Sequence, residues 1–154
     1  MSGARSSRKT RVLLVESDPL LLCNLTLWID LQTDLAVCGQ ASNICEGAAA
    51  AGRLRPDLAI VDLAFGQESG LRLVELLREK EPGLAIVVLS AYEEDLFALP
   101  ALRVGADGFV MHRDATESLL KAIRDVSAGR TYLSPNLRRR FWKETWGNRP
   151  NAAM

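Results

Sequence analysis

Polar side chains with distinct chemistry end four short apolar runs of this 154-residue sequence. These side chains are Glu16, Asp62, Ser90 and His112. A pair of carboxylates supplies the hard oxygen ligands that a divalent cation prefers. An aspartate held beside a metal ion can attack a phosphoryl group, and a nearby hydroxyl and cation can then hold the phosphoryl oxygens. These residue types predict metal-assisted phosphoryl chemistry, provided that the fold brings them together.

The elements that must position these residues alternate along the chain. Apolar runs predict strands at 11–16, 35–39, 58–62, 84–90 and 108–112. Amphipathic or alanine-rich segments predict helices at 20–31, 43–54, 69–83, 93–104 and 115–129. Most of the strands are continuously apolar, as in a parallel sheet that is covered on both faces. Five such βα units predict an open, doubly wound α/β sheet, in which functional groups gather at the carboxyl ends of the strands.

Local signals indicate where several helices begin or break. Pro19 suits the first turn of the first helix, and Ser17 is a candidate N-cap for it. Ser69 is the expected cap of the third helix, and Thr116 of the fifth. Pro100 lies inside the fourth helical pattern and predicts a kink or a shortened helix.

Composition and charge restrict the class of protein. Apolar residues make up 48% of the chain, and no run is long enough to span a bilayer or to form a signal peptide. Cys23, Cys38 and Cys45 lack metal-ligand spacing, so we expect buried thiols in a reducing cytoplasm. The net charge is zero, but residues 1–11 and 137–154 together carry +8 and the remaining body −8. An acidic body argues against nucleic-acid binding by the core.

Four motifs together resemble the receiver domain of bacterial two-component response regulators. They are 12-VLLVESDP-19, 56-PDLAIVDLAFGQESGL-71, 86-IVVLSAY-92 and 104-VGADGFV-110, in the order and spacing that the family uses. The segment 126-VSAGRTYLSP-135 resembles the join that follows receivers of the NarL/FixJ (LuxR-type) group. This resemblance implies a flavodoxin-like (βα)5 fold, a doubly wound parallel five-stranded sheet with strand order 2-1-3-4-5.

The resemblance also implies a division of the chain into three parts. These are a basic N-terminal tail at 1–10, a receiver domain at 11–130, and a linker or tail at 131–154. A linker helix is expected around 136–146, because Leu137 and Phe141 have helical spacing, with Trp142 and Trp146 on a neighbouring stripe. We expect it to pack its aromatic side chains on the domain or on a second subunit. The helix-turn-helix domain that follows such receivers needs two further helices, so it would belong to a longer protein.

Each site residue takes a role from the resemblance. Asp62 matches the phospho-accepting aspartate, and Glu16 matches the first acid of the metal-binding pair. Ser90 matches the hydroxyl that hydrogen-bonds the phosphoryl group, and Phe109 the aromatic whose rotamer follows that hydroxyl. Ala64 falls where the family offers a backbone carbonyl to Mg²⁺.

Two positions in the expected pocket depart from the family pattern. Ser17 stands in place of the second acid, which binds the metal directly, and His112 in place of the lysine that pairs with the phosphoryl group. Gly66 also replaces a usual proline. A hydroxyl removes a negative charge from the cation site, and Asp18 would compensate only if the loop shifted. Because histidine is shorter than lysine and has an ordinary pKa of about 6.5, we expect weak Mg²⁺ binding and slow or absent phosphorylation.

These observations leave two functions open and disfavour a third. One is a conventional switch, in which a histidine kinase phosphorylates Asp62 with Mg²⁺ and shifts a dimer equilibrium. The other, which we favour, is a degenerate receiver that serves a transcriptional regulator as an interaction or dimerisation module. An enzyme is disfavoured, because a phosphatase of the haloacid-dehalogenase type needs an aspartate at Ala64, and a flavodoxin needs a Ser/Thr/Gly-rich loop after the first strand. We therefore expect a cytoplasmic homodimer without enzymatic activity, without membrane attachment and without direct nucleic-acid contact by this chain.

Overall fold

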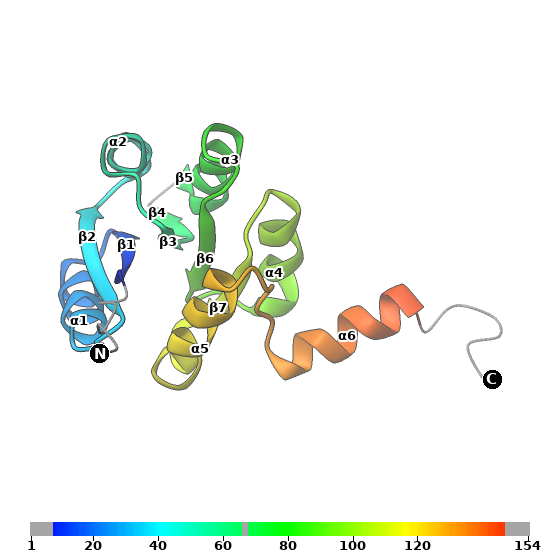
Figure 1. The fold of residues 1–154 in the computed structure, drawn as a ribbon. Helices are drawn as coiled ribbons and strands as arrows, with labels where there is room; N and C mark the ends of the chain where they lie inside the picture. The colour runs from blue at the N-terminus through cyan, green and yellow to red at the C-terminus, as the bar shows by residue number, and fades with distance from the viewer. Residues whose placement is uncertain (1–7, 66–67, 147–154) are drawn as a thin grey trace.

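Five parallel strands form the central sheet of the protein (Figure 1). The computed structural model describes residues 8–65 and 68–146. The strands are β1 (Thr10–Val15), β2 (Leu35–Ala41), β3 (Leu58–Asp62), β6 (Ala85–Ser90) and β7 (Gly108–Met111). Their order across the sheet is β2-β1-β3-β6-β7, and every neighbouring pair is parallel. In chain order this is the 2-1-3-4-5 arrangement, so the predicted flavodoxin-like fold is confirmed.

Helices cover both faces of this sheet (Figure 1). They are α1 (Pro19–Asp30), α2 (Ile44–Leu54), α3 (Gly70–Lys80), α4 (Glu94–Arg103) and α5 (Ala115–Ser127). Residues of α1 and α5 share one apolar core with the sheet, and residues of α2, α3 and α4 share the other. All five residues of β3 are buried between the two cores, which explains why this strand is apolar up to its last residue. Each helix in the described ranges is too short or too polar to cross a membrane.

A short hairpin and a 3₁₀ turn were not predicted from the sequence patterns. A small antiparallel hairpin of β4 (Ala64–Phe65) and β5 (Glu68–Ser69) follows β3. The 3₁₀ turn η1 (His112–Asp114) leads from β7 into α5, so His112 lies just beyond the strand that was expected to include it. Gly66 lies in the hairpin segment outside the described residues.

The cap of α1 corrects one prediction. The Oδ1 atom of Asp18 accepts hydrogen bonds from the backbone N–H groups of Leu20, at 2.9 Å, and Leu21, at 3.3 Å. Asp18 is therefore the N-cap, and the prediction that Ser17 caps this helix is wrong. The physical reason is the proline, because Pro19 occupies the first helical position and leaves the residue before it as the cap.

Other local predictions had mixed outcomes. Ser69 caps α3 as predicted, with its Oγ accepting from the N–H of Leu71 at 3.2 Å. Thr116 does not cap α5, because η1 feeds directly into that helix and α5 begins at Ala115. α4 continues through Pro100 and ends close to its predicted boundary.

The cysteines also differ from expectation. Cys23 and Cys45 are exposed, and Cys38 is half-buried, so the prediction of buried thiols is wrong. Cys23 lies on α1, and Cys45 lies in the first turn of α2, each on the side of its helix that faces away from the sheet.

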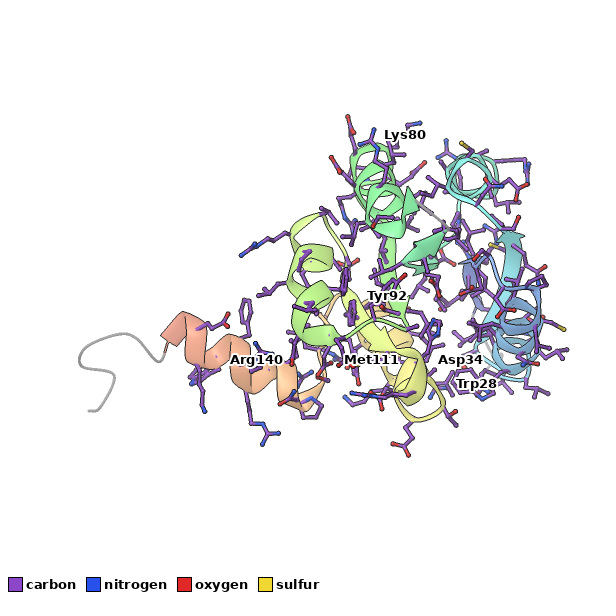
Figure 2. All side chains as sticks on the ribbon, turned by 180° about the vertical axis from the view of Figure 1, so that it is seen from behind. Trp28, Asp34, Lys80, Tyr92, Met111 and Arg140 are labelled. Carbon is purple, nitrogen blue, oxygen red and sulfur yellow. The ribbon has the colours of Figure 1, made fainter. Side chains whose placement is uncertain are left out.

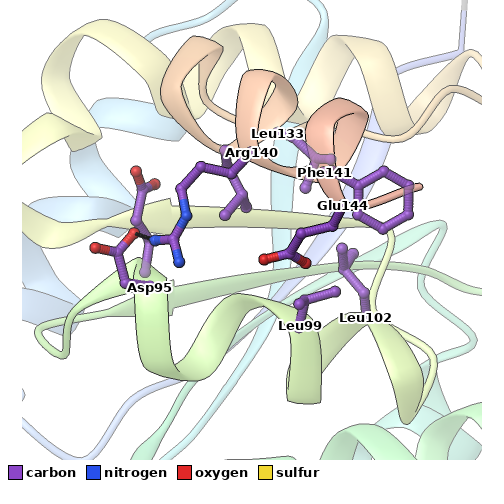
Figure 3. Close-up of a pocket in the computed structure, with 9 residues that line it drawn as sticks. Asp95, Leu99, Leu102, Leu133, Arg140, Phe141 and Glu144 are labelled. Atoms are coloured by element: carbon purple, nitrogen blue, oxygen red, sulfur yellow. Dashed lines mark ion pairs between the residues drawn. The ribbon is translucent and has the colours of Figure 1, made fainter. Parts of the chain in front are cut away.

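The last described helix, α6 (Pro135–Trp146), extends from the β7 edge of the molecule (Figure 1). Leu137 is buried in the core that α4 shares, whereas Phe141 and Trp142 remain 43% and 65% exposed. Arg140 forms an ion pair with Asp95 of α4 (Figure 3). The side chain of Trp146, the tail beyond it and residues 1–7 lie outside the described part of the chain.

Candidate functional site

Three of the expected site residues meet at the carboxyl end of the sheet. Glu16 directly follows β1, Asp62 ends β3, and His112 directly follows β7. Each offers one potential ligand atom, and these atoms lie within 4.8 Å of one another. Glu16 and Asp62 are 5% and 3% exposed, whereas the His112 side chain is 29% exposed. The cluster is therefore an acidic pocket that solvent reaches from the histidine side.

Asp62 is held by both of its carboxylate oxygens. Its Oδ2 lies 2.7 Å from Nε2 of His112, and its Oδ1 accepts a hydrogen bond from the N–H of Ala64 at 2.7 Å. Burial alone would raise the pKa of Asp62, but the hydrogen bonds to His112, Glu16 and Ala64 outweigh it and lower that pKa. The Asp62 contact in turn raises the pKa of His112 above its ordinary value. The geometry thus favours an ionised aspartate paired with an imidazolium.

Glu16 is the carboxyl group of the pocket whose ionised form is least favourable. Its Oε1 accepts a hydrogen bond from the N–H of Asp18 at 3.0 Å, which fixes the side chain over the end of β1. No N–H or O–H group of the described residues donates to its buried Oε2, so this oxygen is satisfied when it carries a proton itself and donates to Asp62. Burial first, and then the neighbouring Asp62 carboxylate, raise the pKa of Glu16 to about 8. Protonation of Glu16 removes the unfavourable buried charge, and the neutral acid can donate a hydrogen bond to Asp62.

Ser17 makes a hydrogen bond that was not predicted from the sequence. Its Oγ donates a hydrogen bond to the backbone carbonyl of Ala64 at 3.2 Å. The hydroxyl and the carbonyl that the resemblance assigns to the metal site are therefore bonded to each other. Asp18 does not enter the pocket with its side chain, which caps α1 instead.

Ser90 and Phe109 lie near the pocket without contacting its acids in any recorded hydrogen bond. Ser90 is fully buried, and its Oγ accepts a hydrogen bond from the N–H of Tyr92 at 2.9 Å. The ring of Tyr92 packs against Phe97 of α4, with ring centroids 5.1 Å apart. Phe109 points into the core on the α4 side of the sheet and is 1% exposed. These residues connect the end of β6 to α4.

Gly70 allows the Asp62 strand end to pack closely on α3. A Cβ atom at position 70 would lie 2.0 Å from the backbone oxygen of Asp62 and 2.8 Å from the Cα of Leu63. Only glycine tolerates this approach of two backbones. The residue therefore has a steric task beside the acidic pocket, in addition to beginning α3.

The strand order and the pocket at the strand ends agree with the family that the comparison with known proteins shows. Residues 12–124 match the response regulator receiver domain. The chain belongs to this family. It is 36% identical over 126 residues to the nitrate/nitrite response regulator protein NarL of Escherichia coli K12, a match that covers 82% of this chain and 58% of NarL. It is 30% identical over 123 residues to the transcriptional activator DevR/DosR of Mycobacterium tuberculosis, covering 80% of this chain and 57% of that protein.

Solved structures share the same receiver fold. A LuxR-family response regulator from Aurantimonas superposes with a TM-score of 0.82 at 24% identity, covering 89% of this chain and 98% of that one. The response regulator domain of Thermotoga maritima CheB gives a TM-score of 0.72 at 28% identity, covering 79% of this chain and 98% of that one. The receiver chain thus spans less than two thirds of the length of NarL and DevR/DosR, but nearly the whole of these two structures.

Proposed function

We propose that this receiver serves a two-component transcriptional regulator mainly as a protein-interaction module, and that Asp62 accepts a phosphoryl group slowly or not at all. The observation that carries the proposal is the hydrogen bond from Ser17 to the carbonyl of Ala64. At these two positions, the family uses a carboxylate and a free carbonyl to hold Mg²⁺. Here a neutral hydroxyl occupies one position and engages the other.

The donor set of the pocket supports weak magnesium binding. Mg²⁺ demands near-ideal octahedral geometry and favours oxygen ligands. In this pocket the side chains grouped with Asp62 are the buried Glu16 carboxyl, which readily holds a proton, and the imidazole of His112. This set does not fit Mg²⁺, so the usual metal-assisted attack by Asp62 lacks its cation.

Contacts between α4 and α6 support a signalling role that does not need phosphorylation. The Oγ of Ser134 donates to the carboxylate of Glu94 at 2.9 Å, and Arg140 pairs with Asp95. Figure 3 shows Leu99 and Leu102 of α4 facing Phe141 of α6. Because an output domain in NarL-like proteins follows the receiver, we infer that α6 transmits the position of α4 to such a domain in a longer protein.

The test is phosphorylation by a small acyl-phosphate donor, read by intact-protein mass spectrometry. We expect no gain of one phosphoryl mass with Mg²⁺ in the unaltered protein or in Asp62→Asn. We expect the double variant Ser17→Asp with His112→Lys, which restores both family residues, to gain one phosphoryl mass. Efficient phosphorylation of the unaltered protein, abolished in Asp62→Asn, would refute the proposal.

A conventional switch is the second candidate, and one observation favours it. His112 reaches Oδ2 of Asp62 at 2.7 Å, and the raised pKa of the imidazole keeps it cationic to higher pH than usual. A cation at this position can hold a phosphoryl oxygen as the family lysine does. The switch would then gain phosphoryl groups from a histidine kinase, and the single variant Ser17→Asp would speed the reaction without any change at His112.

We also propose that the chain forms homodimers, and α1 supports one surface for this. Three leucines on α1 and at its C-terminal end have exposed side chains. They are Leu20, Leu27 and Leu31, which are 70%, 62% and 78% exposed. Exposed apolar stripes of this kind mark contact surfaces. Figure 2 shows Trp28 of α1 at the end of the molecule opposite α6, which leaves the α4–α6 surface separate from such a dimer. Sedimentation velocity of the unaltered chain and of Leu27→Glu tests this, and a monomer at high protein concentration contradicts it.

A further inference from the structure

The two faces of α6 carry different kinds of side chain. Four residues of this helix line the groove between α6 and α4, and they are Leu137, Arg140, Phe141 and Glu144 (Figure 3). The only acid of the helix is among them, and the guanidinium group on this face is paired with Asp95. The contact with α4 therefore occupies the apolar residues and the single acid of α6, and it leaves the opposite face to solvent.

The outward face of α6 is cationic and carries an aromatic ring. Arg138, Arg139 and Lys143 are exposed, and no carboxylate in the described part of the chain forms an ion pair with them. Trp142 follows the two arginines by one helical turn, so these side chains are neighbours on the helix surface. Its side chain is 65% exposed. The outward face thus presents three positive charges around an accessible indole ring.

The position of α6 separates this cationic face from the acidic body of the protein. Figure 1 shows the helix extending from the β7 edge, away from the sheet. Without its two basic ends the chain carries a net charge of −8, which repels polyanions from the sheet and its helices. Salt screens such repulsion beyond about 10 Å. A projecting helix can therefore attract a polyanion that the body repels.

We propose that the outward face of α6 binds single-stranded nucleic acid, with phosphates on Arg138, Arg139 and Lys143 and one base stacked on Trp142. Guanidinium groups bind phosphate through a fork of N–H donors, and lysine adds a mobile positive charge. Every base can stack on an indole ring, and an unpaired strand exposes its bases. This proposal replaces the expectation that the chain makes no direct nucleic-acid contact, because that expectation came from the charge of the body.

Two other anionic partners match this face less well. A helix that lies on a bilayer buries an apolar stripe among the lipid chains, but here Leu137 is buried and Phe141 lines the groove with α4. Among the side chains that the structure describes, Trp142 is the only large apolar group on the outward face. An acidic polypeptide would pair with the cations without needing the indole. A nucleic acid is the partner that uses both the charges and the ring.

The experiment measures the fluorescence anisotropy of a labelled thymidine oligonucleotide of about 20 residues during titration with the full chain. Three phosphate contacts on a single strand predict a slope of about −2 for the logarithm of affinity against the logarithm of salt concentration. A rise in salt from about 50 to 200 mM should therefore weaken binding by roughly 20-fold.

Variants of the outward face should change the two parts of the interaction separately. The combined substitutions Arg138→Gln, Arg139→Gln and Lys143→Gln should abolish binding, because they remove the phosphate contacts. Trp142→Leu should weaken binding by roughly fivefold or more and keep the salt slope, because it removes stacking and no charge. These four side chains are exposed, so the variants should unfold at the same denaturant concentration as the parent.

A matched control removes the same charge from other helices. Arg53→Gln, Arg72→Gln and Lys80→Gln together take three exposed cations from α2 and α3 and should leave the affinity within about twofold. The proposal is overturned if this control weakens binding as much as the α6 variant, or if Trp142→Leu binds as tightly as the parent. It is also overturned if polyglutamate of equal charge competes as well as the oligonucleotide, or if phosphatidylglycerol vesicles bind the chain and the oligonucleotide does not.

This inference goes beyond the function proposed above and does not depend on it. The phosphorylation assay contains no nucleic acid, and the anisotropy assay contains neither Mg²⁺ nor a phosphoryl donor. Failure of one proposal is therefore distinguishable from failure of the other.

Discussion

Replacing Glu16 by glutamine should change how the stability of the fold depends on pH. In the folded protein the pKa of Glu16 is raised to about 8 from 4.5, so the folded state keeps a proton that the unfolded chain loses. The free energy of unfolding therefore falls as the pH rises from 4.5 toward 8. At about 1.4 kcal/mol for each pH unit between the two pKa values, this residue lowers the free energy of unfolding by about 3 kcal/mol between pH 4.5 and pH 7. Glutamine imitates the neutral acid, because its carbonyl can accept from Asp18 and its amide can donate to Asp62.

The assay is urea unfolding of the parent and of Glu16→Gln at half-unit steps from pH 4.5 to 7, with a chelator present to keep metals out of the pocket. The difference in free energy between the two proteins should grow by about 3 kcal/mol in favour of the variant. His112 also contributes, because its raised folded pKa gives stability that is lost as the pH rises above 6.5, and the first cause of that raised pKa, the hydrogen bond to Asp62, is present in both proteins. Glu79→Gln controls for removal of a solvated charge. Parallel stability curves for the parent and Glu16→Gln would refute the assignment of a buried, proton-holding glutamate.

Three further variants and one control test the packing beside the site and elsewhere in the fold. Gly70→Ala should lower the free energy of unfolding by about 3 kcal/mol or more, because the added Cβ would lie 2.0 Å from the Asp62 carbonyl oxygen. As a control, Gly52→Ala in α2 should raise the free energy of unfolding by about 0.5–1 kcal/mol, because no atom lies within 4 Å of the added Cβ. Arg78→Ala should lower it by about 2 kcal/mol, since the guanidinium donates to three backbone carbonyl groups that would lose their partner. Leu137→Ala should lower it by about 2–4 kcal/mol and make α6 easier to cleave by a protease. Denaturant unfolding measures all four changes, and an Arg78→Ala protein as stable as the parent would contradict the role of that network.

The sheet was predictable because its strands carry a one-dimensional signal. A strand buried on both faces must be apolar along its whole length, and β3 is buried at every residue. Alternation with helical segments then restricts the topology to parallel strands with right-handed crossovers. The same logic places Glu16 and Asp62 at one edge of the sheet, because both end neighbouring parallel strands.

The detailed contacts of the site were not predictable, because they depend on rotamers and on short loops. Nothing in the spacing of Ser17 and Ala64 shows that a hydroxyl donates to a carbonyl 47 residues away. The cap of α1 could have been predicted, since a proline at the first helical position already assigns the cap to Asp18. The contact of Glu94 with Ser134 carries no sequence signal at all, because either residue would be unremarkable on an exposed surface.

The two departures from the family pattern act on the pocket in one direction. In the function proposed above, Ser17 offers no carboxylate to a cation, and its hydroxyl engages the Ala64 carbonyl. The imidazole at His112 meanwhile places a nitrogen 2.7 Å from the remaining buried aspartate. Together they leave two carboxyl groups, one of which holds a proton up to about pH 8, and one imidazole in the pocket, a donor set that fits Mg²⁺ poorly.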